Sequence, residues 1–357
     1  MKKTTSFRLL IPIALLVASY EVRPEQPDFL MPHIPAFRTA ALPKPPQIVK
    51  EIALPRVPES LPVFEVLPPP RPEEQVRHAA GAFELKSREG SFHRGRADLR
   101  EETEDPKQQR SLTLFEASGG FFYMHNNRLY SPPEKQPKLP SEEEAHRLAM
   151  EFLRKRELLP EDALADLKSA SFSRPRLVER DAKAGKKLQE IVTGIEVRFP
   201  QAWEGHRVTG PGSKLYVAFG EGGEILGVTR MWRQARKSEA ALPSIPADEA
   251  LELLRRGYGP QSFPHDCVKA VVQRMELAYW SENPRTIQRV GLPVYRIQGV
   301  CRAADERDLG EFEAYAPAVR NQPFEIRQPP PPTSPGDEGN AGKGPEKAVV
   351  ERRNGGN

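Results

Sequence analysis

The sequence predicts an α+β fold made of two tandem modules, each a helix packed on an antiparallel β-sheet, flanked by disordered proline-rich segments. A Leu-Pro-Ser lead-in to a short amphipathic helix occurs twice, at Leu139 and at Leu242, and strand-like segments follow each copy. Fourteen of the 38 prolines lie between Pro24 and Pro72, and seven more lie within 323–345. Such stretches lack sustained apolar periodicity, so they cannot bury enough surface to offset the entropy of ordering.

These signals divide the 357 residues into five segments. We expect, in chain order, a signal peptide, a disordered spacer, a first α+β module with an N-terminal hairpin, a second and smaller module, and a disordered tail, at 1–20, 21–78, 79–238, 239–322 and 323–357. The net charge of +4, with 29% charged residues of mixed sign, predicts no nucleic-acid partner, because such a surface concentrates lysine and arginine on one face.

The N-terminus is typical of an export signal. Lys2, Lys3 and Arg8 precede the apolar run Leu9–Ala18, which is too short to span a bilayer and is interrupted by Pro12. The protein is therefore predicted to be periplasmic, cell-surface or extracellular, and to contact a membrane only if this segment is retained as an anchor. The following spacer is either a semi-rigid arm or a simple linker.

The folded region is predicted to begin with strands at 82–86 and 112–117. Gly119-Gly120 then interrupts the pattern before a further apolar segment at 121–124, and Asn126-Asn127 supplies a turn before Leu129-Tyr130. This arrangement indicates a hairpin at the start of the first module.

The first repeated helix has a complete N-terminal signature. Ser141 can cap it, and Glu144 stands three residues later, as a capping box requires. The apolar positions then follow helical spacing, at Ala145, Leu148, Ala149, Phe152 and Leu153.

Four strand candidates follow this helix, at 167–172, 188–199, 214–219 and 224–232. The last two are expected to form a hairpin, because the glycines around Glu221 supply the positive φ angles of a tight turn. That pairing places Phe219 near Ile225 and Val217 near Gly227.

The second repeated helix is shorter. Pro246 suits its first turn, Ala250, Leu251 and Leu254 form its apolar face, and Gly257 ends it. Strand candidates follow at 267–280, 292–301 and 311–316.

The two cysteines, Cys267 and Cys301, are predicted to form a disulfide, because the chain has an export signal. Folding the flanking strands about a turn at Asn283-Pro284-Arg285 places Cys267 opposite Cys301 and Val271 opposite Ile297. A bridge of this span stabilises by about 3–4 kcal/mol in the chain-entropy model. A redox-active pair is the alternative, but the cysteines lack the close spacing typical of one.

No arrangement of residues predicts catalysis. The seven histidines form no zinc-ligand spacing, no nucleophile elbow is present, and the glycine loop at 220–223 leads into a strand without a Gly-Lys-Ser/Thr sequence. The sequence therefore predicts no catalytic residue, no cofactor and no metal ligand.

Five segments together resemble the PepSY superfamily of exported, non-catalytic domains, which occur in protease propeptides and in cell-envelope regulators. They are SEEEAHRLAMEFL, IPADEALELL, LYVAFGEGGEILGV, LPVYRIQGV and EFEAYAPAV. The family often has Asp-Gly in its hairpin turn, where this chain has Glu221-Gly222-Gly223. The resemblance implies a binding or inhibitory module outside the cytoplasm, acting on a peptidase or a sensor.

We therefore expect an exported, non-enzymatic module that binds a protein partner and regulates or scaffolds it. A strand edge near Tyr315 is a candidate for pairing with a partner peptide. The alternatives are an inhibitor or folding assistant of a secreted peptidase, and a hydrolase whose site is assembled from scattered residues.

Overall fold

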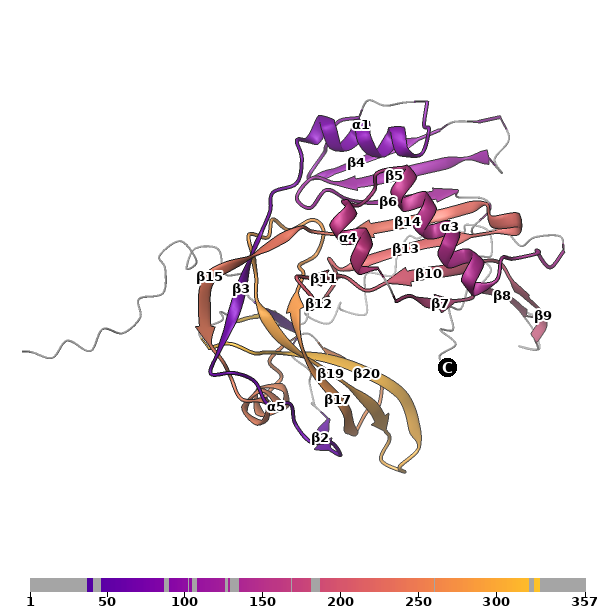
Figure 1. Ribbon diagram of the computed structural model, residues 1–357. Coiled ribbons are helices and arrows are strands. Elements are labelled where there is room, and N and C mark those ends of the chain that lie inside the picture. The colour runs from indigo at the N-terminus through magenta and orange to yellow at the C-terminus, as the bar shows by residue number, and fades with distance from the viewer. Residues whose placement is uncertain are drawn as a thin grey trace, which may run out of the picture.

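The computed structural model confirms an α+β fold that consists mostly of strands (Figure 1). Two large sheets lie one above the other in the view of Figure 1. The predicted signal peptide lies outside the described residues, which are 37–40, 46–86, 90–101, 103–104, 108–125, 128, 135–167, 169–180, 187–259, 261–320 and 324–327.

The first module is a seven-stranded antiparallel sheet with helices on one face. The helices α1 (Pro72–Ala82), α3 (Glu142–Lys155) and α4 (Glu161–Asp166) share one apolar core with the sheet (Figure 1). Its strands, in spatial order, are β4 (Arg96–Arg100), β5 (Arg110–Phe115), β6 (Gly120–His125), β14 (Ile225–Met231), β13 (Lys214–Phe219), β10 (Ile195–Phe199) and β7 (Ser171–Ser173).

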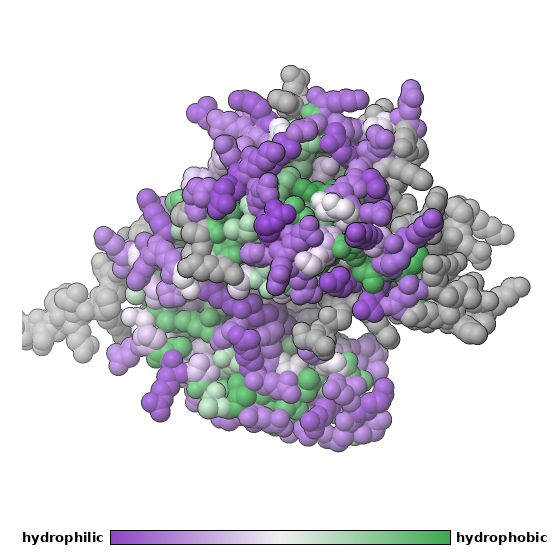
Figure 2. All heavy atoms as spheres, turned by 45° about the vertical axis from the view of Figure 1, so that its right-hand side comes forward, coloured by the Kyte–Doolittle hydropathy of each residue, from purple (hydrophilic) through white to green (hydrophobic). Residues whose placement is uncertain are grey.

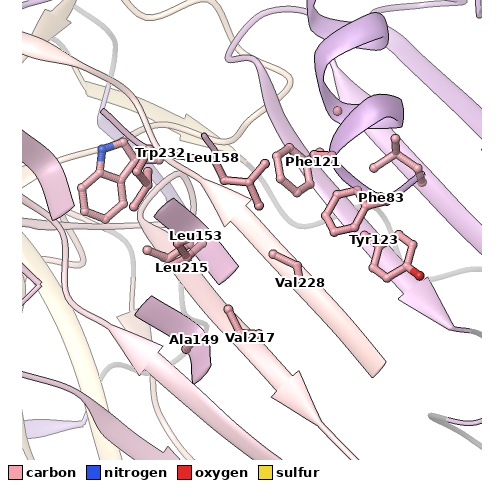
Figure 3. Packing of buried hydrophobic residues seen from close by; sticks show 14 of the residues in the cluster. Phe83, Phe121, Tyr123, Ala149, Leu153, Leu158, Leu215, Val217, Val228 and Trp232 are labelled. Atoms are coloured by element: carbon pink, nitrogen blue, oxygen red, sulfur yellow. The ribbon is translucent and has the colours of Figure 1, made fainter. Parts of the chain in front are cut away.

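Helix α3 forms as the sequence predicts. The Ser141 hydroxyl accepts a hydrogen bond from the backbone N–H of Glu144 at 3.1 Å, which satisfies one donor of the first helical turn. Its apolar stripe faces β13, where Figure 3 shows it beside Leu215 and Val217. The fully buried members of that stripe are Ala145, Ala149 and Leu153.

The predicted β13–β14 hairpin is confirmed, and both of its last turn glycines adopt positive φ angles. Phe219 pairs with Ile225 as expected. A bulge immediately before Phe219 shifts the register, so Val217 lies opposite Val228 rather than Gly227.

The second module contains a curled sheet that wraps around α5 (Ala247–Arg255). The predicted apolar face of α5 is buried against this sheet, at Ala250, Leu251 and Leu254. The strands of the sheet are β11 (Ala202–Trp203), β12 (His206–Thr209), β17 (Lys269–Trp280), β19 (Pro293–Arg302), β20 (Asp308–Pro317), β16 (Gln261–Ser262) and β2 (Gln47–Lys50), of which β12 and β2 pair with β17 in parallel.

A three-stranded sheet lies beside this curled sheet, and the two together form a half-barrel. Apolar side chains of the three-stranded sheet enter the same core as α5. It consists of β15 (Ala235–Pro243), β3 (Ser60–Val66) and β18 (Val290–Gly291). Two further strand pairs stand apart, the antiparallel β8 (Arg176–Arg180) with β9 (Lys187–Val192) and the parallel β1 (Phe37–Ala40) with β21 (Phe324–Arg327).

The predicted disordered segments are partly wrong. The spacer 21–78 contains β1, β2, β3 and the start of α1, and the tail 323–357 contains β21. Strand β3 is ordered because Val63 and Phe64 are fully buried and because β15 and β18 flank it on both sides. Pro72 stands in the first turn of α1. A proline is tolerated there, because the backbone N–H that it lacks would have no partner within the helix.

The strand pairing does not follow the predicted division at 238. Strands β2 and β3, from the predicted spacer, and β11 and β12, from the predicted first module, all pair within the second module. The expected strand at 82–86 is instead the end of α1 and the turn after it, whereas the hairpin at 112–124 is confirmed as β5–β6. The expected turn at 126–127 lies outside the described residues.

Two expected strands of the first module are also shorter than predicted. The segment 167–172 contributes only the beginning of β7, because α4 precedes it. The segment 188–199 forms two strands, β9 and β10, which belong to different sheets.

The disulfide between Cys267 and Cys301 is present, with the two Cα atoms 5.4 Å apart. The predicted register is wrong, however, because Val271 lies opposite Val300 rather than Ile297. The chain between β17 and β19 is longer than a tight turn, contains β18, and is accompanied by a bulge after Val272. A disulfide of this kind indicates an oxidising compartment.

Among the described residues, no helix has the length and apolar character needed to cross a bilayer.

Candidate functional site

An apolar hollow lies where the two modules meet. This junction groove has a volume of about 760 Å³. The first module contributes the turns next to β4 and β5, and the second contributes β3, β18 and the loop before β18. The lining residues are Val63, Phe64, Glu65, Val66, Pro68, Pro69, Gly95, Glu116, Ala117, Ser238, Arg285, Ile287, Gln288, Arg289 and Val290.

One wall of the groove is the 281–289 loop, which connects β17 to β18. A turn at its centre forms as the sequence predicts, because Thr286 N–H donates to the carbonyl of Asn283 at 2.8 Å. The Asn283 side chain also accepts from the N–H of Arg285 at 3.0 Å. These bonds fix the tip of the loop locally, but they do not fix its position on the protein.

Arg233, which follows β14 at the edge of the first module, holds the loop in position. Its guanidinium donates to the carbonyls of Glu282 at 2.7 Å, Asn283 at 3.0 Å and Thr286 at 2.8 Å, and to the Ser281 hydroxyl at 3.2 Å. The side chain is only 3% exposed. A buried cation that satisfies this many buried acceptors at once is a strong constraint on loop geometry.

Burial lowers the pKa of Arg233 to about 10, and the nearby Glu282 carboxylate partly offsets that effect. The guanidinium therefore stays charged at neutral pH, and each of its bonds to the loop is charge-assisted. No carboxylate of the described residues forms an ion pair with it within 4 Å. Backbone carbonyls thus solvate this cation in place of water.

Gln288 makes a second set of buried bonds at the base of the loop. Its Nε2 donates to the carbonyls of Trp280 at 2.8 Å and Val290 at 3.0 Å, and its Oε1 accepts from the N–H of Glu282 at 2.9 Å. The Glu282 carboxylate in turn accepts from the Trp280 indole at 3.0 Å. The two ends of the loop are therefore tied together by one amide side chain.

An aromatic cluster of the second module lies beneath the groove, and one hydrogen bond connects it to the segment after β14. The ring centroids of Phe64 and Tyr279 are 4.7 Å apart, and those of Phe64 and Trp203 are 5.7 Å apart. The Trp203 indole donates to the carbonyl of Arg233 at 2.9 Å. Burial raises the pKa of the Tyr279 hydroxyl, which donates to the carbonyl of Pro62 at 2.9 Å.

The loop presents a large apolar side chain to solvent. Ile287 is 72% exposed. Within the described ranges, the other exposed large hydrophobic residue is Val268, at 48%. The neighbouring Arg285 guanidinium lies 5.8 Å from the ring centroid of Phe115 in the first module. Figure 2 shows hydrophobic side chains surfacing as separate patches within a mostly hydrophilic face.

The lining of the groove is mixed in character. Its wall combines apolar surface with an equal number of acidic and basic side chains, at Glu65, Glu116, Arg285 and Arg289. Within the part of the chain that the structure describes, no group of three potential metal ligands comes together.

The residues singled out from the sequence lie elsewhere. Cys267 and Cys301 are at the opposite end of the β17–β19 hairpin from the 281–289 loop. The strand edge near Tyr315 is not open, because Gln261 and Ser262 of β16 pair with β20 there. Edge pairing at that position is therefore not available to a partner.

Sequence reasoning missed Arg233, Gln288 and Ile287. The one signal for Ile287 was an isolated isoleucine in an otherwise polar stretch. Arg233 carried no signal, because its hydrogen-bond partners follow it in sequence by about 50 residues.

No family model matches the chain, and no curated protein matches it. Among solved structures, the chain is similar to an uncharacterized protein from Eubacterium rectale, with 11% sequence identity and a TM-score of 0.38. The similarity covers 79% of this chain and 90% of that protein. At this level it assigns neither a family nor a function.

Proposed function

We propose that this protein is an exported, non-enzymatic module that binds another protein, in the manner of PepSY-like envelope regulators, and that the junction groove is its binding site. The observation that carries the proposal is Ile287, a 72% exposed side chain on a loop fixed by buried hydrogen bonds. An apolar side chain that is held rigidly in solvent loses little entropy when a partner covers it.

The proposed occupant is an extended, mainly apolar segment of the partner that carries charges of both signs. Pro68, Pro69 and Ile287 line the groove without being buried and would contact its hydrophobic side chains. Glu116 and Arg285 at the rim would meet opposite charges. The volume of about 760 Å³ suits a few residues of an extended chain. The predicted signal and the disulfide support a partner in the envelope or outside the cell.

The test is quantitative co-purification from the native envelope fraction, with Val268→Asp as a matched control for Ile287→Asp. Both changes place a carboxylate on an exposed hydrophobic position, so neither should unfold the protein. We expect a partner that the wild type and Val268→Asp retain and that Ile287→Asp loses. Equal retention by both variants would place the binding surface elsewhere.

A peptidase inhibitor or folding assistant is the second candidate, because the resemblance includes protease propeptides. It requires that the purified protein slow a co-secreted peptidase at a stoichiometric ratio and that Ile287→Asp abolish the effect. Turnover of peptide, ester or glycoside panels by the purified protein would instead favour a hydrolase.

A further inference from the structure

A second cleft lies between the two modules and differs in character from the junction groove. It has a volume of about 600 Å³ and shares no lining residue with that groove. Strands β10 and β13 of the first module form one side, and β12, β19 and β20 of the second form the other. Its charged lining residues are Arg198, Arg207, Lys214, Arg296 and Glu313.

The carboxylates around this cleft are already shared among several cations. Three guanidinium groups contact Glu276, those of Arg207 at 3.5 Å, Arg274 at 2.7 Å and Arg296 at 3.1 Å. Arg296 also contacts Glu313 at 2.6 Å. These carboxylates have little capacity left to neutralise further cations.

Of the other two cations that line the cleft, one lacks a carboxylate partner among the described residues. Arg198 pairs with Glu196 at 2.6 Å, but Lys214 has no carboxylate within ion-pair distance among the described residues. Burial, and then the adjacent charge of Arg296, lowers the pKa of Arg207. Counting Glu196, Glu276 and Arg274 with the lining residues, cations exceed carboxylates by five to three.

Neutral hydrogen-bonding groups complete the walls. The Thr209 hydroxyl lies 2.9 Å from the Tyr315 hydroxyl, and Ser171 and Ser213 face the same cleft. Gln201 is 2% exposed, and its Oε1 receives no hydrogen bond from the described residues.

We propose that this cleft binds a small oxyanion, of the carboxylate or phosphate type, between Arg207, Lys214 and Arg296. Guanidinium groups bind both anions through paired hydrogen bonds, and an anion here would offset the repulsion between Arg207 and Arg296. The site does not depend on the proposed protein-binding function, because it occupies a different cleft.

The test is a titration of the full purified chain with inorganic phosphate and with citrate, by calorimetry and thermal denaturation. Sodium chloride at matched ionic strength is the control for screening. We expect saturable binding of at least one anion and a rise in Tm that chloride does not reproduce. Binding of phosphate alone shows that the cleft prefers a phosphate group, and binding of citrate alone shows that it prefers a carboxylate group.

Variants locate the site. Arg207→Gln and Lys214→Gln should each weaken binding by about tenfold, the loss expected for one charge-assisted contact. Arg307→Gln, at an exposed turn beyond the far end of β19, should leave it unchanged. The proposal is overturned if neither anion binds at millimolar concentration, or if the two cleft variants bind as the wild type does.

Discussion

The two ends of the β17–β19 hairpin are secured in different ways. At one end, Cys267 and Cys301 are joined by a covalent bond within the second module. At the other end, the 281–289 loop is held by the non-covalent bonds of Arg233, which follows a strand of the first module. Each end exposes one large apolar residue, Val268 or Ile287, and Ile287 lines the junction groove whereas Val268 does not.

The position of the loop end therefore depends on how the two modules fit together, whereas that of the disulfide end does not. A change at Arg233 should therefore affect the junction groove and the whole inter-module contact. A change at the cysteines should lower stability and leave the groove intact. The following predictions test that separation.

The largest effect is expected for Arg233→Met. The substitution leaves the carbonyls of Glu282 and Thr286 without a donor and the carbonyl of Asn283 with the Thr286 N–H alone, so we expect the free energy of unfolding to fall by about 3–5 kcal/mol. Urea denaturation measures this loss. Arg236→Met, at an exposed arginine three residues later, should cost less than about 0.5 kcal/mol.

If Arg233→Met does not fold, Arg233→Lys gives the same information. A lysine keeps the charge but cannot reach all of the acceptors, so it should be less stable than the wild type and more stable than the methionine variant. A lysine variant as stable as the wild type would show that the fork of hydrogen bonds does not hold the loop.

Removal of the disulfide is expected to have the next largest effect. The double variant Cys267→Ser and Cys301→Ser should lose about 3–4 kcal/mol, since the bridge closes a separation of 34 residues. Denaturant midpoints with and without the bridge measure the change. If partner binding at the junction groove is lost as well, the two ends are coupled and the comparison fails.

A smaller effect is expected for Gln288→Leu. The leucine leaves the carbonyls of Trp280 and Val290 and the N–H of Glu282 without their partner, so we expect a loss of about 2–3 kcal/mol. Amide hydrogen exchange should accelerate within 281–289 and stay unchanged near Cys301. Uniform acceleration over the whole chain would show that the loop does not open as a local unit.

The parts of the fold that the sequence predicts are those with local signals. Helix α3 follows from Ser141 and its apolar spacing, and the β13–β14 hairpin follows from its glycine turn. Strand β3 could not be predicted, because Pro62 interrupts its apolar pattern and its partner β15 follows more than 160 residues later.

The candidate site was less predictable than the fold for the same physical reason. Arg233 and Gln288 act through backbone carbonyls, which every residue possesses, so no sequence pattern marks their partners. The disulfide was predictable because only two cysteines exist, even though the strand register used to support it was wrong.

The most direct test of the account is site-specific photo-cross-linking in the native envelope. A photoreactive amino acid is introduced either at Ile287 or at Val268, the exposed apolar residues of the two hairpin ends. The account predicts a discrete cross-linked partner from position 287 and none from position 268. Cross-linking from position 268 alone, or equally from both, would contradict the assignment of the junction groove as the binding site.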